Sequence, residues 1–363
     1  MTNKTVSIVM CTYNGERYLK EQLMSLLNQT YSPIEIIIQD DLSTDNTLEI
    51  IHDYQERYPS IIHLFQNSRR LGYNQNFLSA YQKANGYYIA SADQDDIWET
   101  NKIEILIREI GDSTLIFHNS VLFNQKNPNM GLLHKKDWGE HPHPLSVLVN
   151  PKAYGHQILF RREVLPLIHQ FETYNVSYDS LVYTLCSSMG DVKYINQVLV
   201  HWRRHENAST FTSRQANKNK LYGYYTALCA LHDHTKRQIS REYFRLYQRI
   251  QFKFKPDRQV IACMKTGTLY EIIKAGLICV HYRNELFPQK DKGVLCILKS
   301  FFLPLFFIRD YGLGIIRPSK VRSRQDAITD CSAPLSCNIF STNSRKAPCP
   351  PWATVTYFTS CFT

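Results

Sequence analysis

Over its first 120 residues the chain alternates short apolar runs with segments that have the residue spacing of amphipathic helices. Val6–Met10 and Ile34–Ile38 are rich in β-branched residues, which favours buried strands. Glu16–Gln29, which lies between them, places its leucines on one helical face. This alternation predicts an α/β fold, with βαβ units forming a mostly parallel central sheet flanked by helices. The other elements predicted here are strands at Ile61–Phe65, Tyr87–Ala92 and Thr114–His118 and helices at Asn74–Ala84 and Lys102–Ile110.

The patterning divides the chain into three parts. We expect a first domain over residues 1–215, in which Tyr178–Met189 forms a helix and Val192–Trp202 forms a strand. From about residue 217 the pattern becomes helical and basic, which predicts a helical C-terminal extension over residues 216–317. Residues 318–363 lose this periodicity and are rich in Ser, Thr, Pro and Cys, so we expect a tail with little fixed structure.

Charge is unevenly distributed along the chain. Residues 1–150 contain 12 Lys and Arg against 18 Asp and Glu, a net charge of −6, whereas the remainder contains 30 against 14, a net charge of +16. A basic second half favours a polyanionic or membrane-surface partner, and a solvated basic surface is the alternative. Within it, Val294–Ile308 is strongly apolar but shorter than the ~20 residues that span a bilayer. It fits either an interfacial helix or a buried core helix.

Polar clusters follow three of the predicted strands, at Thr12–Asn14, Asp40–Asp45 and Asp93–Asp96. In parallel sheets ligands bind beyond the carboxyl ends of the strands, so these clusters can converge on one crevice. The three carboxylates of the last cluster repel each other unless a cation lies between them. Carboxylate and amide oxygens suit a hard cation such as Mg²⁺ that is shared with substrate phosphates. We therefore predict an enzyme that handles a nucleotide diphosphate, and a solvated acidic turn is the alternative.

Other functional classes have weaker support. The ten cysteines and thirteen histidines show no zinc-site spacing, which disfavours a zinc hydrolase. A nucleotidyltransferase would carry a Gly-rich phosphate loop, and none of the usual spacing is found. A nucleic-acid-binding protein would fit the net charge of +10, but neither a zinc-finger spacing nor an RNP-type motif supports it. Six cysteines lie in apolar surroundings and the first residues run straight into a strand, so we expect a cytoplasmic protein without a signal peptide.

Three segments carry a family resemblance. They are Ser-Ile-Val-Met-Cys-Thr-Tyr-Asn-Gly at 7–15, Asp-Asp-Leu-Ser-Thr-Asp-Asn-Thr at 40–47 and Ala-Asp-Gln-Asp-Asp-Ile-Trp at 92–98. In this order and at these separations they resemble the family 2 glycosyltransferases, which have the GT-A fold. The resemblance covers roughly residues 5–210. Val-Ser-Tyr-Asp-Ser-Leu-Val at 176–182 and the segment at 201–209 are similar to the rhamnosyltransferase-like branch. That branch often has His-Asp-Trp-Trp and Tyr-Arg-Gln-His there, so Tyr178, Ser180 and His201–Trp202 depart from its pattern.

The resemblance implies transfer of a sugar from a nucleotide diphosphate to a hydroxyl group, with inversion at the anomeric carbon. In the family, the residues that match Cys11 and Tyr13 line the nucleotide base. Tyr13 would stack on the base, and Cys11 would act through its backbone. The residue that matches Asp41 accepts a hydrogen bond from the pyrimidine N–H.

The acidic motif supplies the next roles implied by the resemblance. Asp95 matches a ribose-binding carboxylate, and Asp96 matches the ligand of a divalent cation, Mg²⁺ or Mn²⁺. Asp93 lengthens the motif to Asp-Gln-Asp-Asp, which leaves the choice of metal ligand open. Arg203 and His205 are candidates for binding the diphosphate, because the geometry of Arg suits phosphate oxygens. A basic surface patch is the alternative for these two residues.

Asp179 matches the family's catalytic base, which takes the acceptor proton on the face opposite the leaving group. Helix capping is the alternative for Asp179 and also for Asp41. Asn74 and Asn76 lie either near the nucleotide or at a helix cap. His156 either contacts the acceptor sugar or is a structural histidine.

These inferences combine into one expected enzyme, a cytoplasmic glycosyltransferase peripheral to the inner membrane surface. Residues 1–120 would form the nucleotide-sugar half of its catalytic domain, and residues 121–215 the acceptor half. The expected donor is a deoxythymidine- or uridine-linked hexose or deoxyhexose, with rhamnose as the first candidate. The expected acceptor is a polysaccharide or a lipid-linked oligosaccharide, and nucleic acid is not an expected partner.

Overall fold

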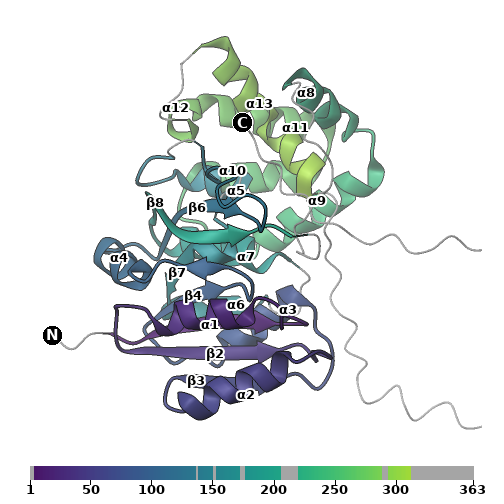
Figure 1. Ribbon diagram of the computed structural model, residues 1–363. Helices are drawn as coiled ribbons and strands as arrows, with labels where there is room; N and C mark the ends of the chain where they lie inside the picture. Colours follow the sequence, from purple (N-terminus) through teal and green to yellow (C-terminus); the bar gives the residue numbers. More distant parts are fainter. Residues whose placement is uncertain are drawn as a thin grey trace, which may run out of the picture.

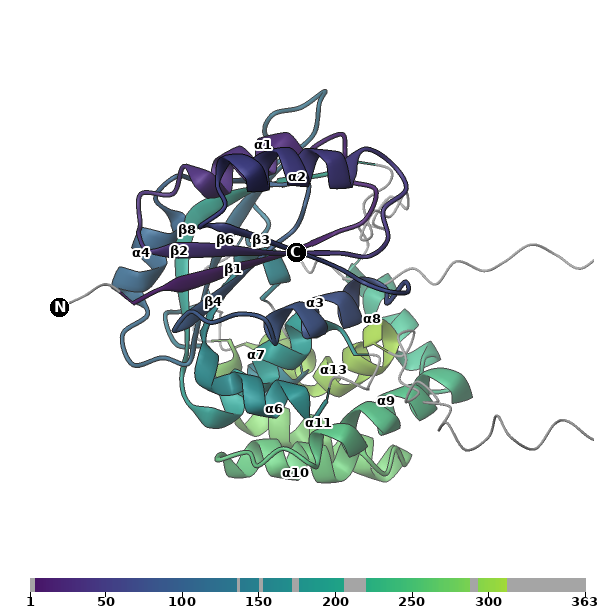
Figure 2. The same cartoon turned by 90° about the horizontal axis from the view of Figure 1, so that it is seen from below.

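A computed structural model describes residues 4–135, 138–149, 153–171, 176–205, 220–287 and 293–311 of the chain. Within these residues an eight-stranded sheet forms the centre of the molecule, with helices on both faces (Figures 1 and 2). The strands lie in the order β3-β2-β1-β4-β7-β6-β8-β5. Their bounds are β1 Val6–Thr12, β2 Ile34–Asp40, β3 Ile62–Gln66, β4 Tyr88–Ala92, β5 Ile97–Trp98, β6 Leu115–Phe123, β7 Ile158–Arg161 and β8 Val192–Arg203.

The first four strands in spatial order are parallel, as the alternation of apolar runs and helices predicts. β1 pairs with β2 on one side and β4 on the other, so that Ile8 lies opposite both Ile36 and Ala90. β3 extends the sheet by pairing in parallel with β2. The predicted α/β fold with a mostly parallel central sheet is therefore confirmed.

The second half of the sheet is mixed. β7 lies between β4 and β6 and runs antiparallel to both. β6 and β8 are parallel, and β8 is long enough to pair also with the two-residue strand β5, which the sequence pattern did not predict. In this pairing Ile97 lies opposite His201. The acidic segment before β5 is thereby held beside the end of β8.

Helices from the first domain cover the two faces of the sheet and form two hydrophobic cores (Figure 2). In β1, Ile8 belongs to the first core and Val9 belongs to the second, because neighbouring side chains in a strand point to opposite faces. Both faces are buried, as is usual for parallel sheets. The helices are α1 Leu19–Leu27, α2 Thr47–Arg57 and α4 Lys102–Glu109 with the first core, and α3 Tyr73–Tyr81, α5 Pro144–Val149, α6 Leu165–His169 and α7 Tyr178–Met189 with the second.

The second core continues into the C-terminal helices, so the predicted helical extension is confirmed. Phe244 and Phe307 of this region belong to the same buried cluster as Phe117 of the sheet. The hydroxyl of Thr184 in α7 also donates a hydrogen bond of 3.2 Å to the hydroxyl oxygen of Tyr247. The helices are α8 Lys220–Cys229, α9 His234–Tyr247, α10 Lys255–Met264, α11 Leu269–His281, α12 Arg283–Leu286 and α13 Val294–Tyr311.

The apolar segment 294–308 forms most of α13. Its second half is core, since Leu303 and Phe307 are buried, whereas Val294 and Leu295 at its start are exposed. None of the helices in the part of the chain described here combines the length and the apolar character needed to cross a bilayer. The predicted domain boundary at 215 and the predicted tail 318–363 lie outside the described residues.

Candidate active site at the carboxyl ends of the parallel strands

The polar clusters that follow β1, β2 and β4 lie together at one edge of the sheet. The backbone N–H of Tyr13 donates to Gln94 Oε1 at 2.9 Å, and Gln94 Nε2 donates to the Tyr13 carbonyl at 3.0 Å. The guanidinium of Arg70 lies 3.6 Å from the centroid of the Tyr13 ring, and its Nε is 3.9 Å from Asp41 Oδ2. Tyr13 thus contacts Gln94 of the Asp-Gln-Asp-Asp motif directly and is linked to Asp41 through Arg70. The three polar clusters therefore lie close together.

Gly15 allows this close approach of the first loop to the acidic motif. A Cβ atom at this position would lie 2.3 Å from Gln94 Oε1, well inside van der Waals contact. Any larger residue would therefore push Gln94 away from Tyr13. The glycine at the end of the first motif has this steric reason.

Asp41 is buried at the end of β2 and organises the loop before α3. Its Oδ1 accepts hydrogen bonds from Leu71 N at 2.7 Å and from Asn67 Nδ2 at 2.8 Å, and its Oδ2 accepts one from Gly72 N at 2.8 Å. These donors fix the direction of the carboxylate. Its contact with a pyrimidine N–H stays a prediction, and the remaining lone pairs of the two oxygens would have to serve it.

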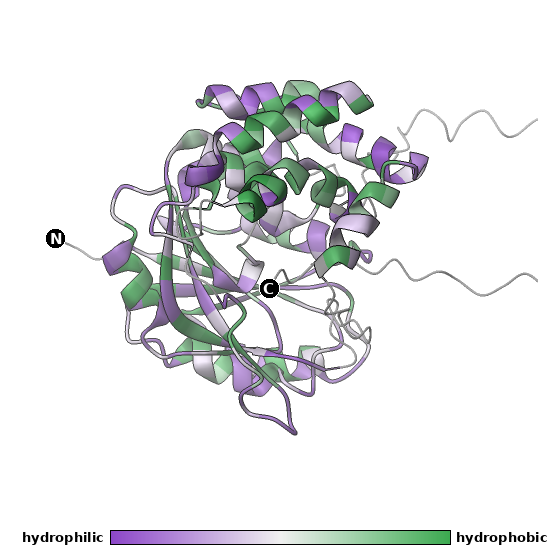
Figure 3. Cartoon of the chain, turned by 90° about the horizontal axis from the view of Figure 1, so that it is seen from above, coloured by the Kyte–Doolittle hydropathy of each residue, from purple (hydrophilic) through white to green (hydrophobic). Residues whose placement is uncertain are grey.

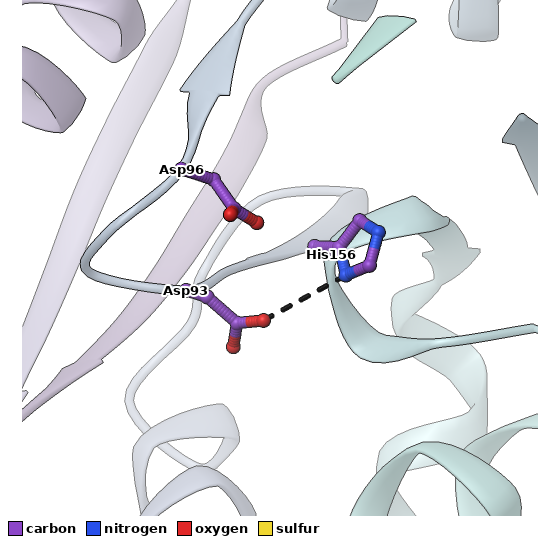
Figure 4. A group of neighbouring side chains, drawn as sticks. All are labelled: Asp93, Asp96 and His156. Atoms are coloured by element: carbon purple, nitrogen blue, oxygen red, sulfur yellow. Dashed lines mark ion pairs between the residues drawn. The ribbon is translucent and has the colours of Figure 1, made fainter. Parts of the chain in front are cut away.

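The acidic motif contributes two carboxylates to a group with His156. Atoms of Asp93, Asp96 and His156 that are able to bind a metal lie within 4.8 Å of one another (Figure 4). His156 Nδ1 is 3.7 Å from Asp93 Oδ2. Asp96 is fully buried, and its Oδ1 accepts from the backbone N–H of Arg203 at 2.9 Å. Its Oδ2 has no hydrogen-bond partner among the described residues.

This orphaned oxygen shows that the site fits a divalent cation. A buried carboxylate oxygen without a donor is costly, and a cation would satisfy it. Burial, followed by the charges of Asp95 and Asp93, raises the pKa of Asp96 well above its usual range. A bound cation would oppose these effects and favour the ionised form. The predicted ligand Asp96 and the unassigned Asp93 both belong to this group, and its remaining member is His156.

Lys102 is a buried basic residue beside the same group. Its Nζ donates to the His156 carbonyl at 2.7 Å and lies 3.2 Å from the ring centroid of Trp98. Burial lowers its pKa well below the usual value, while Asp96 and Asp93 act in the opposite direction. Lys102 was not among the residues predicted from sequence, because its position as the first residue of α4 gives no hint that it points inward.

The side chain of Asp95 pairs with His205. Asp95 Oδ2 is 2.6 Å from His205 Nε2, and each side chain is 19% exposed. Their partial exposure leaves both accessible to a ligand at the edge of the sheet. A carboxylate and an imidazole are also ligands that suit a divalent cation, so this pair is a second candidate for binding one. The ribose contact of Asp95 and the diphosphate contact of His205 remain predictions.

Arg203 holds the acidic loop in place. Its Nε donates to the Asp95 carbonyl at 2.7 Å, and its Nη2 pairs with Glu21 of α1. Its guanidinium also lies 4.4 Å from the ring centroid of Tyr18. Because the side chain is buried, the alternative of an exposed basic patch does not describe Arg203. Contact with a diphosphate stays a prediction for it and would have to compete with these partners.

Asp179 lies in the first turn of α7, next to the turn that carries His156. Its Oδ1 accepts from Ser180 N at 2.7 Å and from the hydroxyl of Ser177. Ser177 occupies the helix cap position, so Asp179 is a residue of the helix and not its cap. Burial raises the pKa of Asp179 and the charge of Asp93 adds to the rise, while the hydrogen bonds from Ser177, Ser180 and Gly155 oppose it.

Gly155 permits this arrangement of α7. A Cβ on Gly155 would lie 1.7 Å from the hydroxyl of Tyr178, which precedes Asp179. The Tyr178 ring is stacked on Phe77 with centroids 4.0 Å apart, so it has little room to move. A side chain at 155 would therefore displace the start of α7.

The remaining candidates, Cys11, Asn74 and Asn76, are buried and lie among residues of the core and the backbone. Cys11 is buried, and burial is the main cause that raises its thiol pKa well above the usual value, so a role through its backbone remains the prediction. Asn74 Oδ1 accepts from Tyr178 N at 3.1 Å, and Asn76 Nδ2 donates to the Gln39 carbonyl at 2.9 Å. Neither side chain caps α3, whose cap residue is Gly72.

The chain is similar to known glycosyltransferases. Residues 7–167 match the family model of glycosyl transferase family 2. The dTDP-rhamnosyl transferase RfbG of Shigella flexneri is 42% identical over 115 residues, which are 31% of this chain and 38% of that protein. The uncharacterized glycosyltransferase alr2836 of Nostoc sp. is 26% identical over 232 residues, 59% of this chain and 71% of its own length. The match to RfbG thus spans well under half of that relative.

The fold is similar to that of a solved enzyme. TarS of S. aureus, residues 1–349, in complex with UDP-GlcNAc, superposes with a TM-score of 0.50 at 13% identity and covers 85% of this chain and 90% of that one. At this identity the likeness concerns the fold alone. The fold is thus of the GT-A type, while residues 7–167 match the glycosyl transferase family 2 model and part of the chain is similar in sequence to a dTDP-rhamnosyl transferase.

Proposed function

We propose that the protein is an inverting, metal-dependent glycosyltransferase that uses a nucleotide diphosphate sugar. The observation that carries this proposal is the meeting of Tyr13, Asp41, the acidic motif and Asp179 at one edge of the sheet. We propose rhamnose as the first candidate sugar, on a deoxythymidine or uridine diphosphate, because the RfbG relative is named a dTDP-rhamnosyl transferase.

The donor would lie across the ends of β1, β2 and β4. Tyr13 offers an aromatic face at the end of β1, and Arg70 at 3.6 Å already occupies one side of its ring. Asp41 is the acceptor for the N–H of a pyrimidine, and Asp95 is available to the ribose. Leu71 N and Gly72 N fix the direction of the Asp41 carboxylate, whose remaining lone pairs would accept from the N–H of the base.

The divalent cation, Mg²⁺ or Mn²⁺, would be held by Asp96 with Asp93 and His156, or at the Asp95 and His205 pair. When bound, it supplies Lewis-acid stabilisation of the charge on the departing diphosphate. Lys102 fixes the turn that carries His156 by donating to the His156 carbonyl at 2.7 Å. Arg203 keeps the loop in one conformation by holding the Asp95 carbonyl and Asp96.

Asp179 would take the proton of the acceptor hydroxyl. Inversion requires a base on the face of the sugar opposite the leaving group, where it activates the attacking oxygen. A carboxylate with a raised pKa is a stronger base than an ordinary aspartate, and Asp179 has this property. We propose a polysaccharide or lipid-linked oligosaccharide as the acceptor, handled in the cytoplasm at the inner membrane surface.

A thermal-shift panel of nucleotide sugars, with and without Mn²⁺ or Mg²⁺, tests the donor. A ligand at about 100 times its Kd stabilises the native state by about 2.7 kcal/mol. We expect one pyrimidine nucleotide sugar to raise the melting temperature, and only when the cation is present. The variant Asp96→Asn should lose this cation-dependent part, whereas Asp112→Asn, at an exposed turn, should keep it. If no nucleotide sugar shifts the melting curve with either cation, the proposal is wrong.

A further inference from the structure

The helices α11 and α13 of the C-terminal region expose large apolar side chains. On α11, Leu269, Tyr270 and Leu277 are 59%, 72% and 58% exposed, and on α13, Val294 and Leu295 are 79% and 77% exposed. We call these five residues the apolar face. In Figure 1 the first turns of α13 lie at the top of the molecule, away from the sheet.

The two helices that carry the apolar face are tightly packed against each other. A Cβ on Gly276 of α11 would lie 2.7 Å from the carbonyl oxygen of Phe301 of α13, so the two backbones are close. Leu269 and Leu277 are eight residues apart, with the exposed Ile273 midway, and therefore share one side of α11. The exposed residues belong to adjoining helices and are not scattered singly over the surface.

The same helix α13 changes character along its length. Leu303 and Phe307 in its second half are buried in the core, so packing explains their apolar nature. Val294 and Leu295 are exposed, so packing within the described residues does not explain why they are apolar. Seen from above in Figure 3, the C-terminal helices present apolar turns next to polar ones, as interfacial helices do.

The net charge of the C-terminal helices favours an anionic occupant. Residues 220–287 and 293–311 contain 14 Lys and Arg against 6 Asp and Glu, a net charge of +8. Lys274 lies on the same side of α11 as Tyr270 and Leu277, and its side chain is 54% exposed. Its partner Glu271, at 3.8 Å, is the one acidic residue of α11. A second copy of the chain would bring two basic surfaces together, which disfavours self-association here.

We propose that the apolar face docks on the surface of an anionic lipid bilayer. The first turns of α13 enter the boundary between headgroups and acyl chains, and Lys274 lies among the anionic headgroups. Binding of this kind needs neither donor nor cation. Its failure would therefore leave the proposed sugar transfer untouched, and failure of the donor panel would leave the docking surface untouched.

Co-sedimentation of the full chain with vesicles tests the proposal. We expect binding to vesicles of phosphatidylcholine mixed with phosphatidylglycerol, weak binding to phosphatidylcholine alone, and release by salt, since screening reduces the attraction. Val294→Ser combined with Leu295→Ser should weaken partitioning roughly tenfold or more. Lys274→Glu should also weaken it by roughly tenfold, because it reverses one charge near the surface.

The control is Met24→Ser on α1, which removes an apolar side chain that is 41% exposed on the other side of the sheet. It should bind vesicles like the unmodified chain. Melting curves of all variants, taken without lipid, should coincide, which separates docking from stability. The proposal is overturned if the α13 double variant binds as tightly as the unmodified chain. It is equally overturned if sedimentation velocity shows a dimer that the double variant abolishes while vesicle binding is absent.

Discussion

At the scale of single residues, Asp179 is the side chain on which the proposed chemistry depends most. Its replacement by Asn keeps the size and removes the base, so we expect donor binding near normal and turnover reduced by roughly 10²–10⁴. The measurement is kcat for transfer together with the donor-induced melting shift. The control Asp112→Asn changes an exposed turn aspartate and should leave both unchanged. Normal turnover of Asp179→Asn would show that another group takes the proton.

The pH dependence of transfer follows from the same residue. Burial raises the pKa of Asp179, and a base acts only when ionised, so activity should be present above this pKa and fall as the pH drops through it. We therefore expect the acid limb of kcat/KM at a pH above the ordinary value for aspartate, about 3.9. In Asp179→Asn the residual activity should lose this limb. A limb that persists in the variant would assign it to a different group.

Sequence reasoning named the carboxylates of the site and His156, but it did not name Lys102 and did not predict that His156 lies beside the carboxylates. Asp96 and Asp93 are visible because acidic residues at a strand end are unusual, and the structure places both in one group. His156 lies in the turn before β7 and Lys102 lies at the start of α4, and at both positions the local pattern is that of ordinary elements. Their proximity depends on sheet pairing, which single-sequence periodicity does not encode.

At the scale of elements, parallel strands were predictable and the mixed edge was not. The strands β1, β2, β3 and β4 follow from β-branched runs separated by helical spacing. β5 has only two residues, too few for a periodicity, and exists because β8 extends past it. The position of β7 between β4 and β6 likewise depends on packing, since a short apolar run carries no information on its neighbours.

The helix α10 contains a buried acid whose effect on stability can be measured. Burial raises the pKa of Asp257 to about 7, and its Oδ1 has no hydrogen-bond partner among the described residues. Below pH 4 the folded and unfolded forms are both protonated, so the group has no effect. Between pH 4 and about pH 7, Asp257 is ionised in the unfolded chain but still protonated in the folded one. Folding therefore becomes less favourable as the pH rises through this range.

Asp257→Asn should therefore stabilise the protein above pH 7, by at most about 4 kcal/mol for a shift of about three pH units. The gain should shrink as the pH is lowered toward 4. Urea unfolding of both proteins at several pH values measures it, and Asp233→Asn, at the exposed cap of α9, is a control whose effect should not follow this profile. A gain that is the same at every pH would contradict the raised pKa of Asp257.

At the scale of the whole molecule, the buried cluster shared by the sheet and the C-terminal helices should make them unfold together. Phe307 of α13 is buried in the cluster that also contains Phe117, so Phe307→Ala should cost about 3–5 kcal/mol. Leu295→Ala, in the same helix but exposed, should cost under about 0.5 kcal/mol. Tryptophan fluorescence, which includes Trp98 and Trp202 of the sheet, and helical circular dichroism should shift by the same amount in urea. If the helical signal moved alone, the two regions would be independent units, and the continuity of the core would have no energetic meaning.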